Sequence, residues 1–251
     1  MVRPPAVAGT FYPADPGELR ATVDGLLARA PAGPVPKALI VPHAGYVYSG
    51  AVAAAGFARV AGRPFARVVL LGPSHFAPLR GLALPQADRF STPLGEVEVE
   101  FPDLPHVVQS DAPHAREHSL EVELPFLIAA LGAFRLVPLA VGGADPETVA
   151  EVIERAWGGA ETLIVVSSDL SHYLDYRSAR ARDESTARSI ESLRLVDPDD
   201  ACGAAPVNGL LTAARRRGLR VERIDLRNSG DTAGDKARVV GYGAFAFLEA
   251  A

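Results

Sequence analysis

Residues 163–172 read LIVVSSDLSH, a run of apolar, mostly β-branched residues that ends in small polar residues, an acid and a histidine. Two further runs of this kind are ALIV at residues 38–41 and VVLL at residues 68–71. Continuous apolar runs of this length are typical of strands buried on both faces, which need helices on both sides of the sheet. The sequence therefore predicts an α/β fold with three layers, α/β/α, around a mostly parallel central sheet.

The segments between these runs complete the pattern of alternating strands and helices. We expect strands at residues 38–41, 67–71, 136–141, 163–167 and 221–225, a hairpin within 81–100, and a last strand in 238–248 that is antiparallel or at an edge. We expect helices at residues 16–30, 50–60, 119–131, 146–157, 178–193, 199–205 and 207–217. The chain has no internal repeat, low-complexity tract or long linker, so we expect residues 1–251 to form one domain.

Charge and composition exclude several classes of protein. The net charge of −5 and the lack of a basic stripe argue against nucleic-acid binding, and the basic run Arg215–Arg217 is expected to face solvent at a helix end. No stretch is long and apolar enough to span a membrane, and the first residues contain no apolar core of a signal peptide. The single cysteine, Cys202, cannot form an internal disulfide. A cytoplasmic protein is therefore expected.

Three histidines directly follow predicted strands. His43 lies in VPHAGY, His75 in GPSHF and His172 in SSDLSHY, while His118 lies in REHSLEVELPF beside a predicted helix start. Ligands of open α/β sheets bind at the carboxyl edge of the strands. One such histidine is explained equally well as a loop residue that bonds its neighbours, but three at one edge favour a functional pocket. Neutral imidazole is a common metal ligand and the usual acid or base near neutral pH.

Acidic residues accompany these histidines. Asp169 precedes His172 by three positions. Glu117, Glu121 and Glu123 surround His118, and with Ser119 as helix cap the last two are expected to oppose the helix dipole.

Asp231, in NSGDTAGD, follows the strand expected at 221–225, which we take to be parallel, so it can reach the same edge. Two histidines and a carboxylate suit non-haem Fe(II), whereas two histidines with an acid or a third histidine suit zinc equally well. Calcium and magnesium are less favoured because they prefer oxygen ligands.

Other catalytic signals are missing. The chain has no GxxxxGK[ST] phosphate loop, no GxGxxG after a strand and no GxSxG nucleophile elbow. Cys202, in ACGAAP, precedes a predicted helix that can activate it, but a lone cysteine in an alanine-rich segment is more often buried and inert.

Six motifs in the same order resemble the Memo family, whose bacterial and archaeal members are called protein B of the AmmeMemoRadiSam system. They are AGTFYPADP, VPHAGY, LGPSHF, EHSLEVELPFL, VVSSDLSHY and NSGDTAGDKARVVGYGAF, and the resemblance runs nearly end to end, from about Pro4 to Phe247. The family is similar in fold to class III extradiol dioxygenases, which open catechol rings with non-haem iron. By this resemblance His43 and His75 are the histidine metal ligands, His172 is an acid/base and His118 is a further pocket histidine.

The resemblance leaves the third ligand open. Animal Memo proteins are taken to carry a cysteine in the segment aligned with NSGDTAGD, where this chain has none. Asp231 or Thr232 stands opposite it, and Asp231 is the better ligand because it is an ionised oxygen donor.

Two functions follow as expectations. One is an iron-dependent, dioxygenase-like enzyme for a small aromatic or phenolic molecule, in which His172 moves protons and Asp169 orients it. The other is a non-enzymatic module that binds a metal or a peptide and works with the radical-SAM partner of the system. Fe(II) is the favoured metal, with copper and zinc as alternatives.

Overall fold

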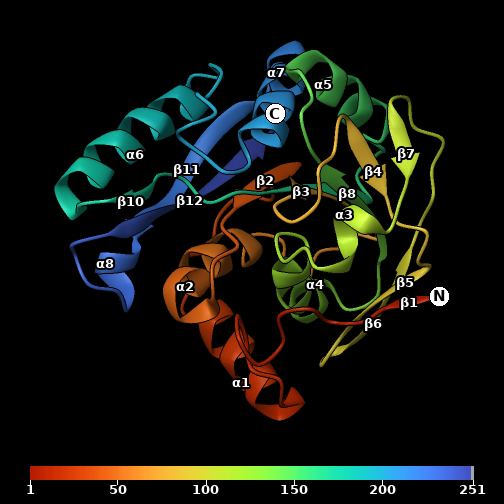
Figure 1. Ribbon diagram of the computed structural model, residues 1–251, viewed down its shortest axis with the longest axis horizontal. Coiled ribbons are helices and arrows are strands. Elements are labelled where there is room, and N and C mark those ends of the chain that lie inside the picture. The colour runs from red at the N-terminus through yellow and green to blue at the C-terminus, as the bar shows by residue number, and fades with distance from the viewer. Residues whose placement is uncertain (250–251) are drawn as a thin grey trace.

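The computed structural model describes residues 1–249, which form a 12-stranded sheet covered by helices (Figure 1). The strands are β1 (Val2–Arg3), β2 (Ala38–Val41), β3 (Arg67–Pro73), β4 (Leu82–Leu84), β5 (Arg89–Thr92), β6 (Gly95–Val99), β7 (Val107–Gln109), β8 (Arg135–Val141), β9 (Thr162–Ser167), β10 (His172–Leu174), β11 (Arg220–Asn228) and β12 (Val239–Leu248). The helices are α1 (Pro16–Leu27), α2 (Tyr46–Phe57), α3 (Ala112–Ala115), the 3₁₀ turn η1 (Glu121–Glu123), α4 (Leu124–Leu131), α5 (Pro146–Arg155), α6 (Tyr176–Glu191), α7 (Ala204–Arg216) and α8 (Ser229–Thr232).

The centre of the sheet is parallel. Strands β6, β8, β3, β9 and β2 lie side by side in this order, and every pair among them is parallel. Antiparallel pairs occur toward both ends, where β5 joins β6 and β12 joins β2. The expected mostly parallel sheet is confirmed, and its parallel strands place their carboxyl ends at one common edge.

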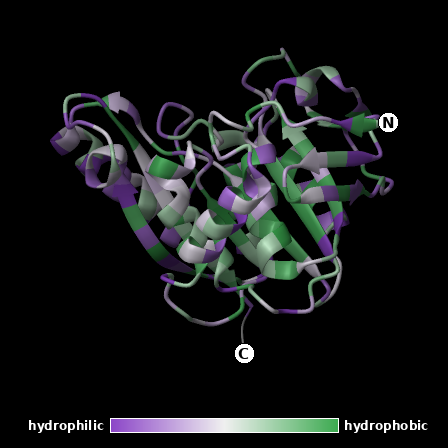
Figure 2. Cartoon of the chain, turned by 90° about the horizontal axis from the view of Figure 1, so that it is seen from below, coloured by the Kyte–Doolittle hydropathy of each residue, from purple (hydrophilic) through white to green (hydrophobic). Residues whose placement is uncertain are grey.

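Helices cover both faces of this sheet, which gives the three layers. Along β3, Val69 and Leu71 pack into a core with α5, α6 and α7, while Val68 and Leu70 pack into a second core with α1, α2 and α4. Successive side chains of a strand point to opposite faces, so one apolar run supplies both cores. Figure 2 shows the apolar residues gathered in the central strands and on the helix faces turned toward them. Within residues 1–249, no helix is long and apolar enough to cross a membrane.

Two expectations on the C-terminal half need correction. The strand expected at 221–225 as a parallel strand is β11, which is longer and pairs only antiparallel, with β12. The tail strand, β12, is antiparallel as expected, and it lies between β2 and β11. The helix expected at 199–205 is a series of turns, and α7 begins only at Ala204. The antiparallel pairing of β11 follows from the insertion of β12 beside β2, a long-range pairing that a local pattern does not encode.

Glu121 holds the N-terminal segment in place through an ion pair and hydrogen bonds. This fully buried carboxylate forms an ion pair with Arg3, accepts hydrogen bonds from the backbone N–H of Ala6 and Val7 at 2.7 and 3.0 Å, and accepts one from the Tyr12 hydroxyl at 2.6 Å. Glu121 was expected to oppose a helix dipole in a first turn. It instead ties the start of the chain to the segment that carries His118.

Candidate metal centre

Three of the four histidines singled out from the sequence meet at the carboxyl edge of the sheet. His43 follows β2, His75 follows β3, and β9 lies between these two strands. The ring centres of His43 and His75 are 5.3 Å apart, and those of His43 and His118 are also 5.3 Å apart. The rings of His75 and His118 stack at 4.7 Å. The structure thus brings His43, His75 and His118 together, whereas His172, which was expected at this edge with His43 and His75, lines a pocket beside them that includes His118.

Cys202 completes a group of candidate metal-ligand atoms that the sequence did not indicate. One donor atom from each of His43, His75 and Cys202 lies within 4.8 Å of the other two, and His43 Nε2 is 3.3 Å from Cys202 Sγ. His75 also belongs to a second group of this kind, with Glu117 and His118. The first group combines two imidazoles with a thiol, a donor set that suits iron, copper and zinc.

Both candidate imidazole ligands are held through their Nδ1 atoms. His43 Nδ1 is 2.7 Å from the hydroxyl of Ser167, and His75 Nδ1 is 2.9 Å from the Glu117 carboxylate. Such contacts fix the ring orientation of metal-binding histidines and leave Nε2 for the ion. In both residues Nε2 is thus the atom available for a ligand.

Glu117 is a structural carboxylate rather than a free ligand. Its oxygens accept hydrogen bonds from the backbone N–H groups of His75, His118 and Ser119 at 2.6, 3.0 and 2.9 Å. Burial opposes ionisation of Glu117, but the hydrogen bonds from His75 and from backbone N–H groups outweigh it and lower its pKa to about 2. A fully ionised Glu117 therefore orders the loops that carry two of the pocket histidines.

The surroundings of His43 and His118 favour the neutral form of both imidazoles. Burial, followed by the nearby imidazoles of His118, His75 and His172, lowers the pKa of His43 well below its ordinary value. Burial also lowers the pKa of His118 to about 4, against the opposing charge of Glu117. These imidazoles therefore keep free lone pairs at neutral pH.

The pKa of the Cys202 thiol is raised, whereas that of a reactive cysteine is lowered. Burial, followed by the nearby Asp169, raises the pKa of Cys202 to about 12. Without a bound cation it is a neutral thiol, since a thiolate at this position needs a positive charge beside it.

His172 and Asp169 line a pocket of about 540 Å³ next to the cluster, together with His118. The Nδ1 of His172 is 2.8 Å from the carbonyl oxygen of Leu170, and Asp169 accepts a hydrogen bond from the backbone N–H of His43 at 2.9 Å. Asp169 was expected to orient His172, but the Leu170 carbonyl does so, and Asp169 instead holds the loop of His43. Burial raises the pKa of Asp169 to about 7, although backbone N–H groups of His43 and Ala44 act against it.

The structure does not bring Asp231, the expected third ligand, to the histidines. Its carboxylate caps α8 by accepting from the backbone N–H of Asn228 at 3.0 Å, and it accepts from the hydroxyl of Tyr176 at 2.5 Å. Its strand β11 ends at the same edge of the sheet, but β12 separates β11 from β2 and moves Asp231 sideways. The alternative, Thr232, donates its hydroxyl to the carbonyl of Ser229 at 3.2 Å. In the described chain, neither residue belongs to a group that could hold a metal ion.

Cys202 reaches the site through a close approach of two backbones. The next residue, Gly203, lies against the end of β9, where its backbone N–H donates to Ser168 Oγ at 2.9 Å. A Cβ atom on Gly203 would lie 2.6 Å from the Cβ of Ser168. The Cys-Gly pair before α7 could have pointed to this contact, because glycine permits a backbone to approach a neighbour closely.

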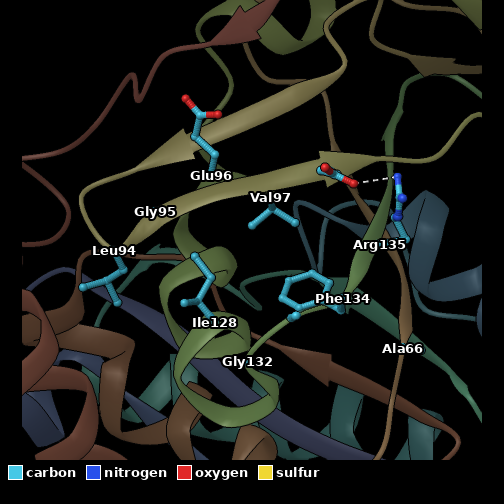
Figure 3. Close-up of a pocket in the computed structure, with 11 residues that line it drawn as sticks. Ala66, Leu94, Gly95, Glu96, Val97, Ile128, Gly132, Phe134 and Arg135 are labelled. Atoms are coloured by element: carbon cyan, nitrogen blue, oxygen red, sulfur yellow. Dashed lines mark ion pairs between the residues drawn. The ribbon is translucent and has the colours of Figure 1, made fainter.

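Another pocket, of about 520 Å³, lies between β6 and α4 (Figure 3). The apolar side chains of Leu94, Val97, Ile128 and Phe134 turn toward it, and Arg135 forms an ion pair with Glu98 at its rim at 2.7 Å. It is lined by no histidine or cysteine. The grouping of donor atoms therefore places the candidate chemistry at the carboxyl edge of the sheet.

The fold and this cluster define a class of protein: a three-layer α/β protein that gathers imidazoles and a thiol at the carboxyl edge of its parallel strands. The family profile described as Memo-like protein matches residues 3–246. The chain belongs to the Memo family.

Full-length relatives and one solved structure agree with this assignment. Proteins called MEMO1 family protein from Aquifex aeolicus and Aeropyrum pernix are each 37% identical to this chain, and the alignments cover 98% and 96% of it and 99% and 98% of the relatives. An uncharacterized protein from Escherichia coli K12 has a similar structure, with a TM-score of 0.50 over 82% of this chain and 98% of that chain. Its sequence identity is 12%, so this likeness concerns the fold alone.

Proposed function

We propose that this protein binds one transition-metal ion through His43, His75 and Cys202 and acts on a small molecule held in the adjoining pocket. The observation that carries this proposal is the convergence of one donor atom from each residue within 4.8 Å of the other two. Donors bound at roughly 2.0 to 2.3 Å from one ion lie at most about 4.6 Å apart. The side chains therefore need only a small adjustment to share an ion.

The surroundings of the donors fit a metal as well as their spacing does. The Nδ1 atoms of His43 and His75 are engaged by Ser167 and Glu117, so both rings present Nε2. Burial keeps His43 neutral and ready to bind a cation. Cys202 would lose its proton on binding, so the affinity for the metal should increase with pH.

The donor set bears on the identity of the metal. Fe(II) was favoured on the expectation of a carboxylate at Asp231, and a thiol at Cys202 gives more weight to copper and zinc than that carboxylate did. When bound, such an ion supplies Lewis acidity, and iron or copper adds redox chemistry.

The pocket beside the donors has the features of a site for an aromatic molecule with a hydroxyl group. Phe11, Tyr48 and Tyr173 contribute aromatic side chains to its lining. The carbonyl of Leu170 can only accept, so His172 donates from Nδ1 and keeps a lone pair on Nε2. His172 is therefore placed to accept a proton from a phenolic hydroxyl in the pocket.

Metal content of anaerobically purified protein tests the proposal directly. We expect near-stoichiometric metal in the parent, loss of metal in His43→Ala and Cys202→Ser, and full retention in Asp231→Asn, the matched control outside the cluster. A parent protein that takes up no ion when iron, copper and zinc are supplied in turn would refute metal binding. Loss of metal in Asp231→Asn would restore the carboxylate as ligand.

Oxygen uptake with a panel of catechols then tests the reaction. We expect turnover by the metal-loaded parent, and in His172→Gln we expect retained metal with strongly reduced turnover. Turnover by metal-free protein, or by His43→Ala, would contradict the assigned roles.

A second function, a metal-holding protein without turnover, is favoured by one observation. The soft thiol of Cys202 beside two imidazoles is a donor set that retains copper or zinc firmly. A stoichiometric metal that persists through all substrate screens would favour this function over catalysis.

A further inference from the structure

Ser167, at the end of β9, connects His43 to a second buried group. Its side chain is fully buried, and its Oγ lies 2.7 Å from His43 Nδ1, 2.7 Å from the carbonyl oxygen of Ser119 and 2.8 Å from Oε1 of Glu123. All three distances are those of hydrogen bonds. One hydroxyl therefore takes part in three hydrogen bonds although it carries a single proton.

Counting protons gives one consistent arrangement. The Ser119 carbonyl can only accept, so the hydroxyl proton of Ser167 must point to it. The two remaining contacts then need protons from the other partners, namely from His43 Nδ1 and from the carboxyl group of Glu123. The two lone pairs of the Ser167 oxygen accept both.

Resting on the metal site proposed above, we infer that Glu123 is a neutral carboxylic acid that donates to Ser167, and that this pair is a positioning unit which holds His43 as the Nδ1–H tautomer with Nε2 directed at the metal position. Ser167 cannot serve as donor to the ring, because its only proton is used by the Ser119 carbonyl. The ring of His43 thus has one tautomer compatible with its surroundings, and that tautomer is the one a metal requires.

A comparison of three buried glutamates on the same segment supports this assignment. Glu117 accepts several backbone hydrogen bonds, and Glu121 accepts from Arg3, two backbone N–H groups and Tyr12. Glu123 is as buried as these two, but within residues 1–249 it has no ion pair and its Oε2 has no hydrogen-bond partner. A buried carboxylate without a cation or donors is costly, and protonation removes this cost.

The electrostatics point in the same direction. Burial raises the pKa of Glu123 well above its ordinary value, the Ser167 contact counteracts this in part, and the charge of Asp169 adds to the increase. The opposite arrangement, in which Ser167 donates to an ionised Glu123, would leave the Ser167 and Ser119 oxygens 2.7 Å apart with no proton between them. It would also leave the negative charge of Glu123 buried and unpaired.

The protonation state can be measured in the metal-free protein. The infrared difference spectrum between the parent and Glu123→Gln at neutral pH should show the loss of a carbonyl band of a protonated carboxyl group. Nitrogen NMR of the labelled parent should show His43 with a proton on Nδ1 and a bare Nε2. A carboxylate band in place of the carboxyl band, or a proton on Nε2, would overturn the inference.

Metal affinity provides the second part of the test. Glu123→Gln keeps a neutral donor toward Ser167 and should retain the tautomer and the parent affinity within about twofold. Ser167→Ala removes the hydrogen bond to the ring and should weaken metal binding by about 10- to 100-fold, the usual effect of deleting such a partner. A parent that binds metal but has His43 protonated on Nε2 refutes this inference alone. A parent with the expected bands and tautomer that binds no metal refutes the proposed function alone.

Discussion

Replacing Gly203 by alanine should separate Cys202 from the histidines without touching any donor atom. The added Cβ would lie 2.6 Å from the Cβ of Ser168 and 2.9 Å from the carbonyl oxygen of Ser167. Ordinary contacts begin at 3.4 Å, so the turn must move away from β9 by about 0.8 Å. Neither neighbour is the flexible end of a long side chain, so the turn itself has to move.

The expected size of the effect follows from this shift. Forcing an extra carbon into a packed site costs about 1 to 3 kcal/mol, which lowers the melting temperature by about 2 to 4 °C for each kcal/mol in a protein of this size. Because Cys202 is the adjacent residue, its Sγ should move from 3.3 Å to about 4 Å from His43 Nε2. An ion held by the two imidazoles would then lie up to about 0.7 Å farther from Sγ, which exceeds the roughly 0.2 Å by which metal–ligand distances normally vary. The thiol should therefore contribute much less to metal binding.

Cobalt(II) reports this change, because its thiolate complexes have a charge-transfer band that purely imidazole complexes lack. We expect Gly203→Ala to lose most of this band and to bind cobalt more weakly than the parent, with urea denaturation of the metal-free protein giving the cost in stability. Gly25→Ala is the matched control. Gly25 lies within α1 with no atom within 4 Å of its added Cβ, so alanine should stabilise the fold by about 0.5 to 1 kcal/mol and leave the band unchanged. A Gly203→Ala protein with the parent's stability and band would refute the close contact.

Three further predictions concern the surroundings of the site. Burial lowers the pKa of His114 to about 4, whereas an unfolded histidine titrates near 6.5. The stabilisation from a neutral His114 is thus complete above pH 6.5 and is lost as the pH falls toward 4, by up to about 3 kcal/mol. The urea midpoint of the parent should therefore decline over this range, and His114→Gln should make this decline smaller. An unchanged decline in His114→Gln would contradict the prediction. Arg3→Met leaves the carboxylate of Glu121 buried without its cation and should cost about 3 to 5 kcal/mol in denaturation experiments, so a loss below 1 kcal/mol would show that the ion pair is dispensable. Asp231→Asn weakens the cap of α8 and should cost about 0.5 to 1 kcal/mol while metal affinity stays at the parent level, and a fall in affinity would contradict its placement outside the site.

The fold was predictable where a strand is marked by a continuous apolar run in its own sequence. The runs ALIV, VVLL and LIVV became β2, β3 and β9, which lie at the centre of the sheet and are buried on both faces. The direction of β11 was misjudged because it depends on the insertion of β12 beside β2, which is far away in the sequence, and residues 199–203, expected to be helical, form turns before α7. Local pattern predicts the burial of a strand, but the identity of its neighbours is decided by the packing of the whole sheet.

Part of the candidate site was likewise predictable from the sequence, and part was not. That His43 and His75 lie close together was predictable because each follows an apolar strand, and parallel strands bring their carboxyl ends together. The sequence favoured Asp231 as the third candidate ligand, whereas the structure places Cys202 beside the two histidines. The position of Cys202 depends on the approach of Gly203 to β9, and that of Asp231 depends on the insertion of β12 beside β2. Neither event leaves a periodic signal in the sequence.

The position of β12 also has a consequence for how the chain assembles. This strand comes late in the sequence yet fills the gap between β2 and β11. During synthesis, a nascent chain that has reached only residue 238 therefore exposes two unpaired strand edges, of the kind that recruit other chains into aggregates. The loop of His43 follows directly from one of these edges, so completion of the pocket depends on the same final step of sheet closure.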